Sequence, residues 1–342
     1  MRKWTGLLSI ALLSLWVAAL ATTPAAAGKD NVFEGRWLSS TAGDLEMLPE
    51  GREGYCVAFS GADTAEPSGL LVPRERIYMT HGNTSFGDTG HVRAYDIPTD
   101  TWISLTSSVN PRAEGVGVGH DGLVYCLGGR YLGSALPLVE VYDPTLDFWT
   151  ELSSMNFARA GLSAAVIGDK IFAIGGRSAT GGPCSGNPLD VAEVYDISLG
   201  VWSPITSPLI PVTDAVAVAK GGDLFLFGGC TAASTPTNAV QIYDRTSDTW
   251  TLGPVMPTPR ASLAAEALGN TIYVIGGLDF STGNLNVVEP FDVDKMVWSG
   301  PCAEKTTSCS EMFAVPHGGK LYIPGSGSFG TTSRIFEIFK KK

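Results

Sequence analysis

The chain has 342 residues, of which Gly and Pro together supply 62, and this share of turn-forming residues argues against a helical bundle. Hydrophobic residues make up 44% and charged residues 17%, which excludes a disordered chain. The formal net charge of −11 disfavours general binding to nucleic acid, because the phosphate backbone has the same sign.

The first 27 residues have the three parts of a secretory signal peptide. Arg2 and Lys3 precede the apolar run from Leu7 to Leu20, and small residues before Gly28 provide a cleavage site. The run is shorter than the ~20 residues that a membrane-spanning helix needs, and no later run is long enough. We therefore expect a mature chain of residues 28–342 that is secreted or periplasmic, has no transmembrane segment and carries a net charge of 21 − 34 = −13.

The rest of the chain is a repeat with three marks. An apolar run ends in a glycine pair, at Gly128-Gly129, Gly175-Gly176, Gly228-Gly229 and Gly276-Gly277. An aromatic residue is followed by Asp, and a tryptophan lies seven residues further on, in the pairs Tyr95/Trp102, Tyr142/Trp149, Tyr195/Trp202, Tyr243/Trp250 and Phe291/Trp298. Altered glycine pairs at His81-Gly82 and Gly325-Ser326 bring the number of repeats to six. Each repeat reads as four short strands separated by turns, which is the pattern of a propeller blade.

These marks resemble the kelch repeat over almost the whole mature chain. The resemblance implies an all-β, six-bladed kelch β-propeller, with more distant similarity to galactose oxidase and to sialic-acid epimerase propellers. We place the blades at about 52–105, 112–152, 159–205, 212–253, 260–301 and 309–342. Residues 33–40 read as a strand that completes the last blade and closes the ring. A hairpin, Gly61–Pro73, is expected to protrude from the first blade.

Arginines recur just before the first strand of a blade, which is the innermost strand. Arg52, Arg112, Arg159 and Arg260 share this position, and Val212 and Cys309 replace it in the other two blades. We expect the four arginines to surround one mouth of the central channel, where planar donors would bind a carboxylate. The alternative is that each arginine pairs with a carboxylate of its own molecule, such as Glu53, Glu114 or Asp214.

The sequence assigns no catalytic residue, cofactor or metal. An epimerase of the sialic-acid type (a mutarotase) needs a base beside an arginine, and Glu114 beside Arg112, or Asp214, could serve. His81 and His91 could share a metal ion, but no carboxylate or cysteine spacing supports such a site. We expect both histidines to have structural or surface roles.

Six cysteines in an exported chain predict disulfides, although free buried thiols remain the alternative. Cys302 and Cys309 lie in one loop, Cys184 and Cys230 in corresponding loops of adjacent blades, and Cys56 and Cys126 in adjacent blades. We expect these three pairs.

The leading functional hypothesis is a monomeric binding protein that recognises a protein, an acidic peptide or an anionic sugar on the loop face of the propeller. The first alternative is a carbohydrate-active enzyme of the epimerase type. The second alternative is a structural protein of the envelope. The fold does not separate the three, because function depends on sites placed on the fold.

Overall fold

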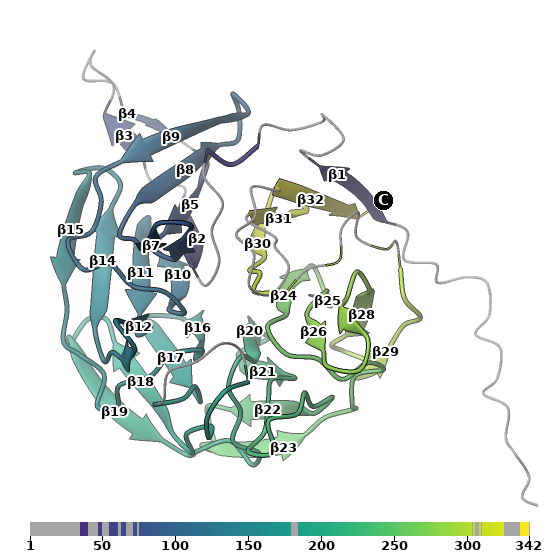
Figure 1. Ribbon diagram of the computed structural model, residues 1–342. Helices are drawn as coiled ribbons and strands as arrows, with labels where there is room; N and C mark the ends of the chain where they lie inside the picture. Colours follow the sequence, from purple (N-terminus) through teal and green to yellow (C-terminus); the bar gives the residue numbers. More distant parts are fainter. Residues whose placement is uncertain are drawn as a thin grey trace, which may run out of the picture. The chain divides into compact units, whose positions relative to one another are not determined.

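Six four-stranded antiparallel sheets make up most of the computed structural model, as far as the chain is described (Figure 1). The described residues are 35–39, 47–49, 55–60, 63–65, 71–73, 75–178, 184–302, 304, 308, 310–324 and 336–341. All regular elements within them are strands. The expected all-β, six-bladed propeller is confirmed. The expected signal peptide, residues 1–27, lies outside the described residues.

In each blade the strands follow one another from the innermost outwards. Blade one contains β2 (Cys56–Ser60), β5 (Arg76–Thr80), β8 (Val92–Asp96) and β9 (Thr101–Leu105), and blade two contains β10 (Val116–His120), β11 (Leu123–Leu127), β14 (Val139–Asp143) and β15 (Phe148–Glu151). Blade three contains β16 (Ser163–Ile167), β17 (Lys170–Ile174), β18 (Ala192–Asp196) and β19 (Val201–Ile205). Blade four contains β20 (Val216–Lys220), β21 (Asp223–Phe227), β22 (Val240–Asp244) and β23 (Thr249–Leu252). Blade five contains β24 (Ala264–Leu268), β25 (Thr271–Ile275), β28 (Val288–Asp292) and β29 (Val297–Trp298). Blade six contains β30 (Val315–His317), β31 (Lys320–Pro324), β32 (Phe336–Lys341) and β1 (Gly35–Ser39).

The six innermost strands form a closed ring around the channel. Each contacts the innermost strand of the next blade, in the order β2, β10, β16, β20, β24, β30 and back to β2. Figure 1 shows these strands on the inner side of the sheets, with β15, β19 and β23 outermost. The segments just before the innermost strands therefore gather at one end of the channel.

The last blade is completed from both ends of the described chain. β1 pairs antiparallel with β32, and Gly35 lies opposite Lys341 while Ser39 lies opposite Glu337. β32 pairs in turn with β31, so the sheet order is β1-β32-β31-β30. The closing strand expected at residues 33–40 is confirmed. The outer edge of β32 is thereby covered by a strand of the same chain.

Short hairpins extend from several of the connections. The hairpin expected at Gly61–Pro73 is present as β3 (Asp63–Ala65) paired with β4 (Leu71–Pro73). Three further two-stranded hairpins follow the second strands of blades one, two and five; they are β6 (Asn83–Thr84) with β7 (Gly87–Asp88), β12 (Arg130–Tyr131) with β13 (Ser134–Ala135), and β26 (Leu278–Asp279) with β27 (Gly283–Asn284).

The repeated aromatic residues pack within each blade, and the tryptophans also join it to the preceding blade. Tyr142 lies opposite Trp149 on adjacent strands, with ring centroids 5.2 Å apart. The Trp149 indole Nε1 donates a hydrogen bond to the carbonyl of Thr106 in the preceding blade, at 3.0 Å. Trp202, Trp250 and Trp298 repeat this contact with a carbonyl of the blade before them. The aromatic residues of each repeat therefore stabilise their own blade and also attach it to the blade before it.

Glycine allows two innermost strands to approach backbone to backbone. A Cβ atom at Gly117 in β10 would lie 2.5 Å from the backbone nitrogen of Val57 in β2, so no larger residue fits without movement. The innermost strands therefore contain small residues because neighbouring blades come closest together near the axis of the channel.

Candidate functional site: the channel mouth

Three arginines expected at the channel mouth are instead inside the blades. Arg112, Arg159 and Arg260 are each 0% exposed. The fourth, Arg52, lies outside the described residues. The expectation that these guanidinium groups surround the mouth is therefore wrong for the three that are described.

Each buried arginine forms an ion pair with a glutamate on the third strand of its own blade. Arg159 Nη2 lies 2.7 Å from Glu193 Oε1, and Arg260 Nη2 lies 2.7 Å from Glu289 Oε2. Arg112 Nη1 pairs with Glu140 in the same way. The three glutamates are 0–2% exposed. The alternative expectation, that these arginines pair with carboxylates of their own molecule, is therefore correct. The carboxylates, however, are not those of Glu114 and Asp214.

The fourth blade replaces both members of the pair together. Val212 stands at the arginine position, and Gln241 stands where blades two, three and five have glutamate. The Gln241 side chain accepts a hydrogen bond from the Ile210 amide at 2.8 Å and donates one to the Ile210 carbonyl at 2.9 Å. The neutral amide of Gln241 leaves no buried carboxylate beside Val212 without a cation.

Glu140 shows how these pairs hold their charge. Burial raises the pKa of Glu140, but hydrogen bonds from His81 and Arg112 and the charge of Arg112 outweigh it and bring the pKa down to about 2. Ser108 and Asn110 also donate hydrogen bonds to this carboxylate. The glutamate is ionised at neutral pH and fully engaged within the blade, so neither it nor Arg112 faces a ligand.

The mouth itself is formed by the residues two positions after Arg112 and after the equivalent residues of the later blades. Gly161, Asp214, Ser262 and Glu311 each donate a backbone hydrogen bond of 2.7–2.9 Å to the equivalent residue of the preceding blade, starting at the carbonyl of Glu114. All five have φ between 50° and 59°, a left-handed conformation in which the chain turns into the innermost strand. A chain of blade-to-blade hydrogen bonds thus fixes these residues at the start of the channel.

Two arginines that sequence reasoning missed pair with the acids at this mouth. Arg177 Nη1 lies 2.7 Å from Asp214 Oδ1, and Arg177 Nη2 pairs with Glu114. Arg130 Nε lies 2.6 Å from Glu114 Oε1, and its Nη1 lies 3.5 Å from Asp88 Oδ2. Both arginines directly follow a glycine pair, in LGGR and IGGR, and this position is the signal that could have identified them. Glu114 therefore lies beside Arg177 and Arg130. The expectation that Glu114 acts beside Arg112 is wrong, because Arg112 pairs with Glu140.

Among the described residues, the mouth has more carboxylates than cations. Glu114, Asp214, Glu311 and Asp88 carry four negative charges against the two positive charges of Arg130 and Arg177, which leaves 2 − 4 = −2. Arg177 is 0% exposed, whereas the side chains of Glu114 and Arg130 keep 12% and 22% of their surface. Burial raises the pKa of Glu114 above its ordinary value, although the charge of Arg177 and the hydrogen bond from Arg130 act against this.

A cavity at the mouth combines these acids with an apolar lining. Glu114, Asp214 and Glu311 share its wall with apolar side chains, namely Leu162, Ala215, Val216, Leu263, Met312 and Phe313. Such a wall fits a side chain that has an apolar stem and a cationic end, because the stem can pack on the apolar residues while the charge meets carboxylates.

A second cavity lies further along the channel, between the middle parts of the innermost strands. It has a volume of about 350 Å³ and is lined mainly by Gly, Ala and Val. Glu266 is the charged residue among those that line it. Burial raises the pKa of Glu266 to about 7, and its one recorded hydrogen bond comes from the Ala267 amide at 2.8 Å. No signal in the repeat pattern distinguishes Glu266, since it occupies an ordinary first-strand position.

Two of the expected disulfides are present. Cys56 is bonded to Cys126 and Cys184 to Cys230, with Cα atoms 5.9 Å and 5.2 Å apart. The second bridge lies at the mouth, where the Cys184 amide donates a hydrogen bond to Asp214 Oδ2 at 2.8 Å. The expected pair of Cys302 and Cys309 includes Cys309, which lies outside the described residues.

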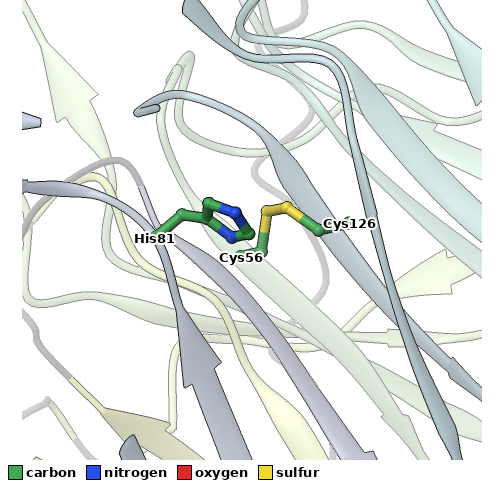
Figure 2. A group of neighbouring side chains, drawn as sticks. All are labelled: Cys56, His81 and Cys126. Carbon is green, nitrogen blue, oxygen red and sulfur yellow. A yellow bond between two sulfur atoms is a disulfide. The ribbon is translucent and has the colours of Figure 1, made fainter. Parts of the chain in front are cut away.

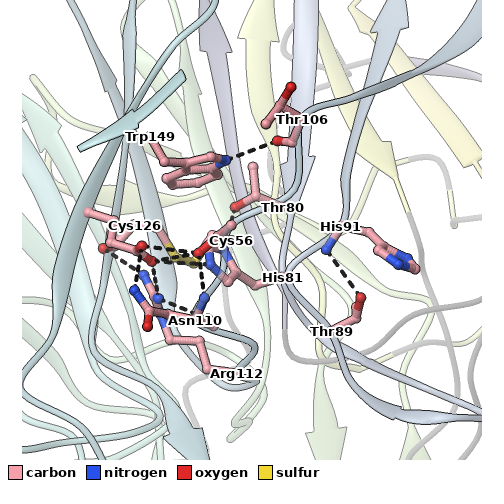
Figure 3. A network of polar contacts seen from close by, with 12 residues as sticks. Cys56, Thr80, His81, Thr89, His91, Thr106, Asn110, Arg112, Cys126 and Trp149 are labelled. Carbon is pink, nitrogen blue, oxygen red and sulfur yellow. Dashed lines mark hydrogen bonds and ion pairs between the residues drawn. A yellow bond between two sulfur atoms is a disulfide. The ribbon is translucent and has the colours of Figure 1, made fainter. Parts of the chain in front are cut away.

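His81 and His91 do not form a common site. His81 is 1% exposed and its ring lies beside the bridge of Cys56 and Cys126, whereas His91 is exposed and its ring points away from this cluster (Figure 3). The His91 amide donates a hydrogen bond to Thr89 Oγ1 at 3.1 Å. The two histidines therefore have separate environments.

The repeat marks and the six sheets agree with known family models. The model of the KLHDC2/KLHL20/DRC7 Kelch-repeats domain matches residues 161–337, more than half of the chain, and the Kelch motif matches residues 111–156. The chain belongs to the kelch-repeat family. The buried arginine–glutamate pairs and the blade-to-blade hydrogen bonds are thus features of a kelch propeller.

Curated relatives of this kelch propeller are longer proteins. Kelch-like protein 23 of Homo sapiens is 31% identical over 172 residues, which cover 49% of this chain and 30% of the relative. An F-box/kelch-repeat protein of Arabidopsis thaliana is 30% identical over 215 residues, covering 61% of this chain and 52% of the relative. The chain thus spans only part of the length of these relatives.

Among solved structures, the one titled "Structure of YjhT" is similar to this kelch propeller with a TM-score of 0.69 and 17% identity. The match covers 85% of this chain and 95% of that chain, and at this identity it shows the fold alone. In the described part of the chain there is also no helix of the length and apolarity needed to cross a membrane.

Proposed function

We propose that this kelch propeller is an exported binding protein whose channel mouth receives a basic side chain of a protein ligand. The observation that carries the proposal is the excess of carboxylates among the described residues of the mouth, where Glu114, Asp214 and Glu311 line one cavity. The ligand expected from the sequence was a carboxylate. The buried positions of Arg112, Arg159 and Arg260 remove the basis for that expectation.

A protein ligand is favoured by the family and by the surface. A kelch-repeat propeller supports a role in protein interaction, and the similar proteins carry their repeats within longer chains. The mouth cavity offers charge and apolar surface side by side, which suits Lys or Arg. The overall negative charge of the chain adds a long-range attraction for a basic partner.

Export is supported by two independent observations. The first 27 residues have the composition of a signal peptide. Two disulfides join strands or loops of neighbouring blades, and such bridges persist in oxidising compartments.

A direct test uses fluorescein-labelled pentalysine and fluorescence anisotropy with residues 28–342. Glu311→Gln should weaken binding about two- to fivefold, because one charge pair at a partly exposed site contributes about 0.5–1 kcal/mol. Asp121→Asn is the matched control, since this carboxylate is 83% exposed and lies away from the mouth. Asp214→Asn should add to the loss, with a thermal melt to show that the variant is folded. Equal affinities for the wild type and the two mouth variants would contradict the proposal.

An epimerase-type enzyme is a second candidate, and the position of Glu114 favours it. This carboxyl lies between Arg130 and Arg177, and its pKa is raised by burial, so it has the neighbours that a base acting beside a sugar carboxylate needs. Proton NMR of N-acetylneuraminic acid with the protein tests this candidate. Anomer or epimer exchange no faster than in buffer would exclude it for this sugar. If the protein also failed to bind pentalysine, a structural role in the envelope would remain.

A further inference from the structure

Cys56, Cys126 and His81 meet where the first two blades join. Cys56 starts the innermost strand β2, Cys126 lies in β11 of the next blade, and His81 follows β5. The three residues are 0–1% exposed, and their two sulfur atoms and one imidazole nitrogen all lie within 4.8 Å of one another (Figure 2). Two sulfurs and an imidazole nitrogen are a common part of zinc sites.

The imidazole of His81 is held on several sides. Its Nδ1 lies 2.9 Å from Thr80 Oγ1, and its Nε2 lies 3.4 Å from Glu140 Oε2. The edge of the ring meets Trp149, with centroids 5.1 Å apart (Figure 3). Whichever nitrogen binds a metal, the other keeps an oxygen neighbour. Such an outer partner fixes the orientation of a metal-bound histidine.

We propose that Cys56, Cys126 and His81 form a redox-gated metal site, closed by the disulfide and able to bind Zn²⁺ after reduction. A phosphine and one water convert the disulfide to two thiols and a phosphine oxide, which accounts for both electrons. Each thiol then releases one proton to solvent as its sulfur binds the ion. The histidine supplies the third ligand in its neutral form, and solvent occupies the fourth position.

The ion pair of Arg112 and Glu140 borders this pocket. Arg112 Nη2 donates to the Cys126 carbonyl at 3.3 Å, which places a guanidinium beside the cysteine. Because Glu140 neutralises Arg112, the charges of the two thiolates are balanced by the metal ion itself.

The second disulfide of the molecule provides an internal contrast. The bridge of Cys184 and Cys230 packs against Ala261. Within the described residues no third ligand joins these two cysteines in a group that could hold an ion. The proposal therefore predicts that reduction opens a metal site at one bridge and not at the other.

The test uses Co²⁺ as the probe, because thiolate ligation gives a charge-transfer band in the near ultraviolet. A chain with serine at Cys184, Cys230, Cys302 and Cys309 keeps only the proposed ligands among its cysteines. After reduction with a phosphine, this chain should bind one Co²⁺ with the thiolate band, and Zn²⁺ should displace it. Before reduction the band should be absent. A second chain with serine at Cys56 and Cys126, and the other four cysteines kept, should lack the band after reduction.

The His81→Ala variant separates a built site from binding to loose thiols. We expect its Co²⁺ affinity to fall at least tenfold, while its near-ultraviolet circular dichroism shows a folded propeller. The Zn²⁺ ion should also raise the melting temperature of the reduced protein, since it binds only the native arrangement. An unchanged affinity in His81→Ala, or no Co²⁺ bound by the reduced and folded chain, would overturn the proposal.

Discussion

At the scale of single residues, the buried charges are held in pairs that differ from blade to blade. Arg159 and Glu193 have almost no exposed surface, and Asn156 donates both its amide hydrogen and a side-chain hydrogen to the same glutamate. Breaking such a pair leaves one buried charge without its partner, which is far more costly than replacing both members. Blade four shows the replaced form, with Val212 and Gln241.

The first prediction compares single and double replacements in blade three. Arg159→Val should lower the free energy of unfolding by about 3–5 kcal/mol, because Glu193 keeps its charge without a cation. Arg159→Val combined with Glu193→Gln, which reproduces the residues of blade four, should regain at least half of that loss. Urea unfolding of the three proteins measures both values. A double variant as unstable as the single one would show that the charge is not the cause.

The second prediction concerns Glu266 in the channel. Because burial raises its pKa to about 7, the native state holds a proton that the unfolded chain releases near its ordinary pKa of 4.5. The contribution of this group to stability therefore falls as the pH rises from about 4.5 to 7 and is constant above that range. Glu266→Gln should be more stable than the wild type at pH 8, by up to about 3 kcal/mol at ~1.4 kcal/mol per pKa unit.

The control for Glu266 is the same comparison at pH 4.5. There the carboxyl of the native protein is protonated, so the glutamine variant should gain little stability over the wild type. Thermal melts across this pH range measure the difference. A gain that does not depend on pH would mean that the carboxyl of Glu266 does not titrate in the predicted range.

At the scale of elements, the innermost strands depend on glycine where blades meet. The third prediction is that Gly117→Ala destabilises the protein, since its Cβ would overlap the backbone of Val57 and push β10 away from β2. Overpacking of this kind costs about 1–3 kcal/mol or more. Gly300→Ala is the matched control, because a Cβ atom there meets nothing within 4 Å. Equal stabilities of the two variants would contradict the close approach.

The repeat was predictable from the sequence because its marks are local. The glycine pairs, the aromatic residues and the tryptophans recur at fixed spacing, and each spacing reflects one four-stranded sheet. The mouth was harder to predict, because the direction of a side chain depends on its blade. Arg112 points to the third strand, whereas Glu114, two residues later and in a left-handed turn, reaches the channel. Arg130 meets Glu114 from within the same blade, whereas Arg177 belongs to the next blade and reaches Glu114 only when the two blades pack together.

At the scale of the whole molecule, the ring is closed by β1 against β32. Every residue of the five-residue strand β1 pairs with β32, so its loss would expose a strand edge. The fourth prediction is that a chain of residues 40–342 melts at least ~5 °C below residues 28–342, since about 1 kcal/mol corresponds to a few degrees in a domain of this size. It should also aggregate more readily. A chain of residues 33–342 keeps β1 and serves as the control, and it should behave like the longer chain.

The sign of the charge that the channel mouth prefers is the most direct measure of its function. The decisive measurement is the affinity of residues 28–342 for labelled pentalysine and labelled pentaglutamate at low and physiological ionic strength. The carboxylates Glu114, Asp214 and Glu311 predict tighter binding of pentalysine, with an affinity that weakens but persists as salt is added. Tighter binding of pentaglutamate would contradict this account and would return the arginines to the centre of the site.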